Sequence, residues 1–228
     1  MLSILYADDA LLFVDKPAGI VVQRGYDPDE PVLLELAVAE VGHLYLMQRL
    51  DRGTSGVMFF SRRADINAKL TRQFETKRIP KSYLALVEGE VAERQTVDAP
   101  LARIGPISFG VRDEGKRAIT VVEPLAAGAD GSLLAISLMT GRTHQIRVHL
   151  AAIGHPLVGD WLYGARNATR PMLHSAELVM THPVSNQPLR VVSALPDDFR
   201  GAAADRGVDV ETALKRGRTD LPGVQLNH

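Results

Sequence analysis

The sequence predicts an α+β fold in which a large, mainly antiparallel β-sheet carries a few helices. Strongly β-prone runs recur along most of the chain, and a small number of amphipathic segments separate them. With 228 residues and 46% apolar side chains, the chain is long enough to bury a sizeable core. No repeat, low-complexity linker or clear boundary divides it. We therefore expect one domain over residues 1–200 and a polar extension over residues 201–228.

The N-terminal part predicts a hairpin followed by a helix. Apolar runs at residues 4–5 and 11–14 flank Asp8-Asp9, which is typical of a hairpin turn. Residues 31–41 have helical spacing, and Pro31 suits the first turn of that helix. The expected caps are an acidic residue at the start and a glycine at the end, namely Asp29 or Glu30, and Gly42.

The remaining elements follow from periodicity. Ile66, Leu70 and Phe74 recur every four residues and predict an amphipathic helix over residues 65–76. A further helix over residues 143–153 is ended by a glycine. The expected strands are residues 44–46, 57–61, 82–87, 133–138, a closing run around 173–179, and 189–192. From about residue 201 the pattern predicts only a weak helix or a tail.

Composition excludes several classes of chemistry. The chain has no cysteine, so it forms no disulfide, thiolate metal site or cysteine nucleophile, and a reducing, cytoplasmic setting fits. The first residues lack a basic region and a long apolar run, so we expect no signal peptide, and no run is long enough to cross a membrane. The formal net charge is −1, so any contact with nucleic acid must come from local clusters of arginine and lysine.

One carboxylate, Asp51, stands between two arginines in a loop rich in glycine, threonine and serine. Arg49 and Arg52 would hold Asp51 ionised, as a nucleophile or a general base requires. Apolar strands are expected on both sides of the loop, which would hold it at the edge of a sheet. The alternative is an aspartate that is simply ion-paired in a surface turn.

An arginine-rich helix start forms a second candidate. Arg142, His144 and Arg147 lie near the beginning of the helix expected over residues 143–153, where arginine and a helix N-terminus favour phosphate. Arg147 lies between apolar neighbours, which favours pairing with a carboxylate. The alternative is a solvated basic face. The histidine spacing does not place two ligands on one helical face, so we expect no metal.

Tyr83 is the third candidate. It lies in a β-prone run, where an aromatic side chain usually packs in the core. The alternative is a ring that stacks on a nucleic-acid base, a contact worth about 1–3 kcal/mol.

Together these segments resemble the RluA family of RNA pseudouridine synthases. The likeness runs from about residue 4 to residue 199. The matching segments are LLFVDKPAG at 11–19, RLDRGTSG at 49–56, KSYLA at 81–85, GRTHQIRVH at 141–149, GHPLVGD at 154–160, LHS at 173–175 and HP at 182–183. Their number, order and spacing make the resemblance specific.

The resemblance implies an isomerase that converts uridine to pseudouridine in ribosomal or transfer RNA without cofactor or metal. The implied fold has a central RNA-binding cleft, and the protein is expected to be a monomer. In this scheme Asp51 acts on the nucleotide, Tyr83 stacks on the uracil and Arg147 pairs with Asp51. The implied substrate-binding residues are Arg49, Arg52, Thr54, Lys81, Arg142, His144 and Leu173. The basic residues expected to contact the RNA backbone are Lys69, Arg72, Lys77, Arg78, Lys81 and Arg142.

The chain departs from the family at Gln48, where histidine is usual; glutamine can bond but cannot carry charge. We expect no S4 RNA-binding domain. Two alternatives stay open: a non-catalytic RNA-binding or RNA-chaperone protein on the same fold, and a carboxylate-dependent glycosidase. A glycosidase usually has two acids about 5–10 Å apart. The acids that would favour it, if they faced Asp51, are Glu35, Glu75 and Glu88.

Overall fold

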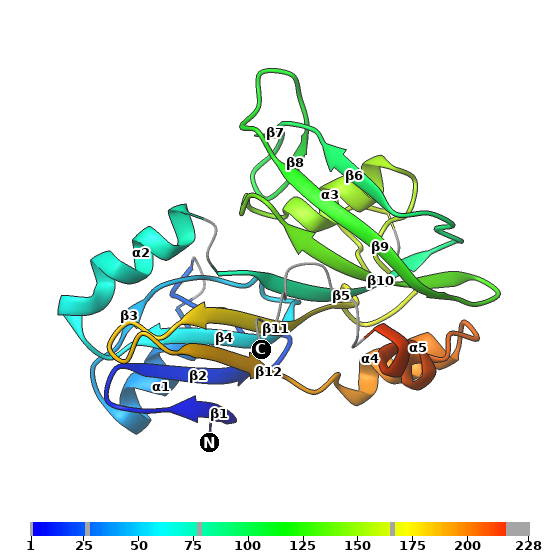
Figure 1. Ribbon diagram of the computed structural model, residues 1–228. Coiled ribbons are helices and arrows are strands. Elements are labelled where there is room, and N and C mark those ends of the chain that lie inside the picture. The colour runs from blue at the N-terminus through cyan, green and yellow to red at the C-terminus, as the bar shows by residue number, and fades with distance from the viewer. Residues whose placement is uncertain (1, 26–27, 77–78, 165–166, 218–228) are drawn as a thin grey trace. The chain divides into compact units, whose positions relative to one another are not determined.

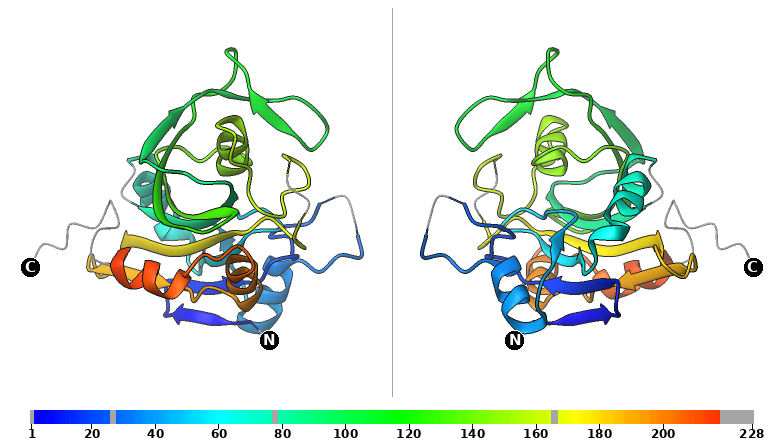
Figure 2. Two further views of the ribbon diagram at one scale, coloured as in Figure 1. Left: turned by 90° about the vertical axis from the view of Figure 1, so that its right-hand side faces the viewer. Right: turned by 90° about the vertical axis from the view of Figure 1, so that its left-hand side faces the viewer.

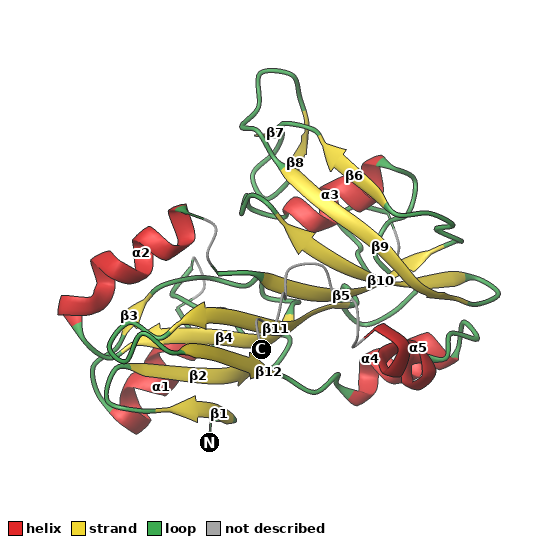
Figure 3. Ribbon diagram, viewed as in Figure 1, coloured by secondary structure: helices red, strands yellow, loops and turns green. Residues whose placement is uncertain are grey.

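Figure 1 shows the computed structural model, which describes residues 2–25, 28–76, 79–164 and 167–217. The chain divides into two compact units. The first consists of Met1–Lys81 and His174–Ala194, and the second of Ser82–Leu173 and the segment that begins at Leu195. Strands dominate both units, with a few short helices (Figure 3). Among the strand pairs described here, all but one are antiparallel, which confirms the predicted α+β class.

The sheet of the first unit begins with the predicted hairpin. Its strands are β1 (Ile4–Ala7), β2 (Leu11–Lys16), β4 (Ser55–Ser61) and β11 (Leu173–Thr181), in that order, with β3 (Tyr45–Leu46) on β4 and β12 (Pro188–Val192) on β11. The carboxylate of Asp8 closes the hairpin turn by accepting from the backbone N–H groups of Ala10 (2.8 Å) and Leu11 (2.7 Å). The exception to the antiparallel pattern is the parallel pair of β4 and β11.

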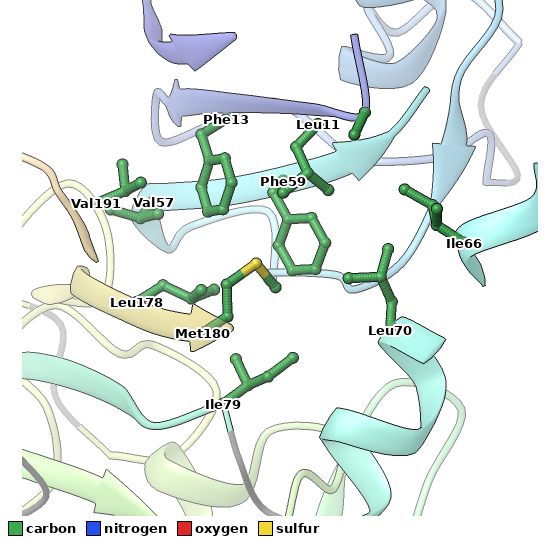
Figure 4. Close-up of a cluster of buried hydrophobic side chains, with 11 residues drawn as sticks. Leu11, Phe13, Val57, Phe59, Ile66, Leu70, Ile79, Leu178, Met180 and Val191 are labelled. Carbon is green, nitrogen blue, oxygen red and sulfur yellow. The ribbon is translucent and has the colours of Figure 1, made fainter. Parts of the chain in front are cut away.

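Alternating side chains give this sheet two buried faces. On one face, Leu11 and Phe13 of β2 join Phe59 of β4 in a core that includes Leu70 of α2 (Asn67–Glu75), as Figure 4 shows. The rings of Phe13 and Phe59 stack with centroids 5.1 Å apart. Burying each such side chain stabilises the fold by about 1.5–3 kcal/mol. Helices α1 (Leu33–Val41) and α2 lie on opposite sides of the sheet (Figure 2).

Helix α1 ends as predicted but begins differently. Gly42, with φ 87°, ends it, and its N–H bonds the oxygen of Val38. The expected acidic cap is wrong: the residue before the helix is Val32, and no side chain caps it. The first N–H groups of the helix are instead bound by another segment, since Leu33 and Leu34 donate to the oxygens of Val21 (2.9 Å) and Val22 (3.1 Å).

The second unit has an antiparallel sheet of β5 (Lys81–Glu88), β10 (Gly131–Leu138), β9 (Ile119–Ala127) and β6 (Gln95–Asp98), in that order. A separate hairpin joins β7 (Leu101–Arg103) and β8 (Phe109–Val111). Helix α3 (Gln145–Ala152) packs against this region, where Val148 joins Leu101 and Ala118 in a small core. Strands β6 to β9 were not predicted from the sequence.

Two helices follow the last strand. The expected boundary at residue 200 falls inside α4 (Asp197–Ala204), and α5 (Val210–Gly217) comes after it. Arg170 donates from Nε and Nη2 to the carboxylate of Asp198 in α4, at 2.6 and 2.9 Å. The side chains of Val208 and Val210 are buried. These helices thus belong to the second unit, and the assignment of residues 1–200 as one domain stays a prediction. No helix in the described part of the chain has the length and apolar character needed to cross a membrane.

Candidate active site

A fully buried lysine holds the loop that carries Asp51. The Nζ of Lys16 donates to the backbone oxygens of Pro17 (2.9 Å), Arg52 (3.1 Å) and Thr54 (2.8 Å). The N–H of Thr54 donates to the oxygen of Asp51 at 3.0 Å and closes the turn. A buried ammonium is tolerated only with such partners. Here the partners are backbone oxygens that bracket the turn, so Lys16 fixes its shape.

Arg52 braces the same turn from outside. Its backbone oxygen accepts from the N–H of Gly19 at 2.8 Å, and its Nε donates to the oxygen of Gly19 at 3.0 Å. Gly19 has φ 89°, a conformation that favours glycine. A guanidinium nitrogen of Arg52 also lies 3.4 Å from the carboxylate of Glu30. Arg49, by contrast, is exposed and pairs with no carboxylate among the described residues.

The strand after the turn is held by the parallel pairing with β11. The Oγ of Ser55 lies 2.9 Å from Nδ1 of His174, and both side chains are buried. Gly56 has φ 108°, and a Cβ there would lie 2.2 Å from the backbone oxygen of Ser175. Only glycine fits that approach. The Gly-Thr-Ser character of the motif therefore reflects the packing that fixes Asp51.

Gln48, three residues before Asp51, has a buried side-chain amide. The residue is 9% exposed, and in the part of the chain that the structure describes neither Oε1 nor Nε2 has a hydrogen-bond partner. A buried polar group without a partner is destabilising. The side-chain amide of Gln48 is therefore destabilising in this structure.

Replacing Gln48 with methionine should raise the free energy of unfolding by about 1–3 kcal/mol, the cost of a buried polar group without a partner. Methionine has nearly the same length and shape and carries no amide. Thermal melting measures the effect, with about 2–4 °C expected per kcal/mol for a chain of this size. Gln145→Met is the matched control: its amide makes several bonds, so that change should lower the melting temperature. A Gln48→Met protein that melts below wild type would contradict the prediction.

Helix α3 in the second unit is fixed by polar side chains. The amide of Gln145 accepts from Thr140 Oγ1 (2.8 Å) and from the N–H of Arg142 (3.0 Å), and donates to Ile119 O (3.0 Å) and Thr120 Oγ1 (3.0 Å). It thereby joins the loop before α3 to β9. The residue before the helix, His144, has the left-handed values φ 55° and ψ 17°.

His149 in α3 is structural. Its Nδ1 lies 2.9 Å from Thr120 Oγ1 and its Nε2 lies 2.9 Å from Ala99 O. Burial lowers the pKa of this imidazole, partly offset by the hydrogen bond to Ala99. The ring is therefore a neutral link in the core rather than a phosphate ligand.

Arg147 pairs with a carboxylate inside its own unit. Its Nε and Nη2 donate to the two oxygens of Asp160 at 2.7 and 2.8 Å, and the side chain of Asp160 is fully buried. The pair is bidentate, the geometry that orients a guanidinium most firmly. The N–H of Leu162 also donates to Asp160 at 3.2 Å.

Asp160 and Tyr163 are site residues that sequence reasoning missed. Asp160 is the last residue of the segment GHPLVGD, and the apolar setting of Arg147 favoured a carboxylate partner. That signal points to a carboxylate but does not identify Asp160 as that partner. The ring of Tyr163 lies under Arg147, with its centroid 5.0 Å from Cζ. Nothing in its local sequence distinguished Tyr163 from other aromatic residues.

The other predicted site residues differ in exposure. Tyr83 and Leu173 are buried, at 6% and 4% exposure, and Thr54 is buried as well. The stacking role of Tyr83 therefore stays a prediction. Arg142 is exposed and donates from Nε to the oxygen of Arg117 at 3.1 Å.

The basic residues expected to contact RNA are partly engaged in the fold. The Nζ of Lys69 donates to Pro183 O (2.5 Å) and Asn186 Oδ1 (2.6 Å), which ties α2 to the loop between β11 and β12. Arg72 is exposed on α2. Lys77 and Arg78 lie outside the described residues. Lys69 thus supports the fold, and Arg72 is available for an anion.

Lys81 lies over the ring of Phe74, with Nζ 4.7 Å from the centroid. Burial lowers the pKa of its ammonium from the ordinary 10.5 to about 8. The ammonium is therefore still charged at neutral pH, but in an environment that opposes the charge.

Lys81→Met should remove a pH-dependent part of the stability. Because the folded-state pKa lies below the unfolded value, the unfolded chain binds more protons between about pH 8 and 10.5, and Lys81 adds stability as pH rises through that window. Below about pH 8 the buried charge costs its full penalty. Chemical denaturation of both proteins from pH 7 to 10.5 should give the methionine variant the higher free energy of unfolding at pH 7. The difference in free energy of unfolding between the two proteins should shrink as pH rises. A difference that is constant over this range would exclude the lowered pKa.

The structure brings the predicted residues together in two groups. Arg49, Asp51, Arg52 and Thr54 share the turn of the first unit, and Arg142, His144 and Arg147 share the start of α3 in the second. The expected pairing of Asp51 with Arg147, and the cleft between them, stay predictions. Of the three acids that would favour a glycosidase, two bind arginines elsewhere: Glu35 binds Arg24, and Glu88 binds Arg206. Glu75 is exposed at the end of α2.

Comparison with known proteins assigns the class. A family model described as RNA pseudouridylate synthase matches residues 10–152. The chain is 38% identical over 217 residues to ribosomal large subunit pseudouridine synthase D of Nitrosomonas europaea, covering 87% of this chain but only 63% of that protein. It is 35% identical to tRNA pseudouridine synthase C of Yersinia pestis, with 91% of both chains covered. The solved human RNA pseudouridylate synthase domain containing 1 matches with a TM-score of 0.78 at 25% identity, covering 96% of this chain and 95% of that one.

The chain therefore belongs to the RNA pseudouridylate synthase family, and the resemblance to its RluA branch is confirmed. This is a class of RNA-modifying isomerases, as the motifs predicted.

Proposed function

We propose that this protein isomerises specific uridines to pseudouridine in structured RNA, with Asp51 as the catalytic carboxylate. The observation that carries the proposal is the family match together with an intact Asp51 in a turn held by buried Lys16. A carboxylate on a turn whose backbone is held at several points suits a reaction in which one group must reach a sugar carbon or proton.

The reaction exchanges one bond to the sugar for another. The target uridine leaves the base stack so that its glycosidic bond can be reached. Asp51 then bonds to the nucleotide or removes a sugar proton, and the bond between N1 and C1′ breaks. The uracil turns and C5 bonds to C1′, while the bond to Asp51 breaks again or the sugar proton returns to its carbon. The proton on C5 is lost and N1 is protonated. The atoms balance without an external oxidant or reductant.

The remaining residues bind and orient. Tyr83 stacks on the uracil, and Arg147 pairs with Asp51 while Asp160 holds it from the other side. Arg49, which is exposed, contacts a phosphate or fills the space left by the extruded base. The residues proposed to complete substrate binding are Arg52, Thr54, Lys81, Arg142, His144 and Leu173.

The proposed substrate is ribosomal or transfer RNA, bound by a cytoplasmic monomer. Relatives named for each RNA class support each choice: the ribosomal relative is the more identical, at 38% against 35%, and the transfer RNA relative is matched over more of its length, 91% against 63%.

The test is a tritium-release assay on ribosomal and transfer RNA labelled at C5 of uridine, because isomerisation frees that hydrogen. Wild-type protein should release tritium from one RNA class, and reverse-transcription mapping should place the product at defined uridines. RNA binding with no release from either class would instead support the non-catalytic RNA-binding protein.

A further inference from the structure

Tyr163 joins three parts of the second unit at one side chain. Its Oη accepts from the backbone N–H of Phe109 in β8 at 3.0 Å. The same oxygen lies 2.8 Å from Nδ1 of His144, the residue before α3. Its ring lies against the guanidinium of Arg147, with 5.0 Å between the ring centroid and Cζ.

The phenolic hydroxyl can hold both partners at once, because it has one proton to donate and an oxygen that can accept. Phe109 donates to the oxygen, and the imidazole tautomer sets which of the hydroxyl and Nδ1 of His144 donates to the other. The hydroxyl therefore links β8 to the start of α3.

The start of α3 depends on that link. His144 has a left-handed backbone, rare for a residue with a side chain, and no side chain caps the helix. Such a conformation persists where surrounding contacts fix it. The imidazole contacts the hydroxyl of Tyr163 and packs edge to face against two rings. Its centroid lies 5.6 Å from that of Phe109 and 5.7 Å from that of Tyr163.

Arg147 is thereby held in two directions. Asp160 fixes the guanidinium within its plane through Nε and Nη2. The ring of Tyr163 covers one face and limits rotation out of that plane, through a cation–π contact.

We propose that Tyr163 is a positioning residue for the isomerisation, which anchors Arg147 to the β7–β8 hairpin and to His144. The inference rests on the proposed function, in which Arg147 aims Asp51. Tyr163 touches neither substrate nor the reacting atoms in this account. Its hydroxyl fixes the ring, and the ring fixes the arginine.

The experiment compares Tyr163→Phe and Tyr163→Leu with wild type in steady-state tritium release from the RNA that wild type modifies. Phenylalanine keeps the ring and loses the hydroxyl link, so kcat should fall about tenfold, or about 1.4 kcal/mol in barrier, with KM unchanged. Leucine also loses the ring, so kcat should fall further. Tyr45→Phe loses a hydroxyl elsewhere, in β3, and should match wild type.

RNA affinity and melting temperature separate positioning from other roles. RNA affinity should stay close to wild type for Tyr163→Phe when it is measured in an Asp51→Asn background. The melting temperature should fall by only a few degrees, because phenylalanine removes the hydroxyl that binds the N–H of Phe109. A rise in KM at constant kcat, or a loss of kcat that only follows a loss of folded protein, would overturn the positioning role, as would an unchanged Tyr163→Phe enzyme. A wild-type protein that releases no tritium from any RNA would instead refute the proposed function itself.

Discussion

Replacing Asp51 with asparagine should abolish pseudouridine formation and leave the fold intact. Asparagine keeps the size of the side chain but cannot act as nucleophile or base at neutral pH. The turn should survive because its supports are backbone atoms: the N–H of Thr54 bonds the oxygen of Asp51, and Lys16 binds the oxygens of Arg52 and Thr54. The expected loss of turnover is about 10⁴-fold or more, the scale found when a catalytic carboxylate is removed.

Tritium release measures this loss, and thermal melting checks the fold. Asp65→Asn is the control, because Asp65 is an exposed aspartate that pairs with Arg63 at the surface. It should retain full activity. Turnover of Asp51→Asn within about tenfold of wild type, or about 1.4 kcal/mol in barrier, would rule out the assigned role.

Replacing Asp160 with alanine should cost about 3–5 kcal/mol of stability, because it removes the buried carboxylate that binds the guanidinium of Arg147 through two hydrogen bonds. Activity should fall too, since the partner that orients Arg147 is lost. Denaturant unfolding measures the stability. Asp198→Ala is the matched control: Asp198 makes the same bidentate contact to Arg170, but its side chain is 45% exposed, so the loss should be clearly smaller.

A double variant separates stability from function at this pair. Arg147→Met with Asp160→Leu removes both charges together and should recover much of the stability lost by Asp160→Ala. It should remain inactive, because no guanidinium is left to hold Asp51. A loss of less than about 1 kcal/mol for Asp160→Ala would show that the pair contributes little to the fold.

The sequence predicted what is encoded locally. Asp51 stands out because its motif is contiguous, and α2 stands out because Leu70 and Phe74 repeat with the helical period. Strand β9 escaped prediction because Pro124 normally argues against a strand interior. The strand accepts it through a register shift opposite Leu133 and Leu134.

Long-range pairing set the limit at the site. The side chain of Lys16 bonds backbone oxygens 36 and 38 positions later in the sequence. A lysine in a strand before a proline gives no sign that it will be fully buried, since lysine almost never is. The prediction of an acidic cap on α1 failed for the same reason, because backbone oxygens of a separate segment accept the hydrogen bonds that a capping side chain would accept. Sequence periodicity contains no information on such partners.

The parallel pairing of β4 with β11 has a consequence for synthesis. The segment that follows the turn, at Ser55, is secured by His174, which lies 119 residues later in the chain. A ribosome must therefore make the whole second-unit sheet before the first-unit sheet can close. Loop closure over such a span is slow compared with local folding. The nascent chain should thus contain Asp51 well before β11 is available to hold the strand that follows its turn, and it should gain activity only after the segment around His174 has been made.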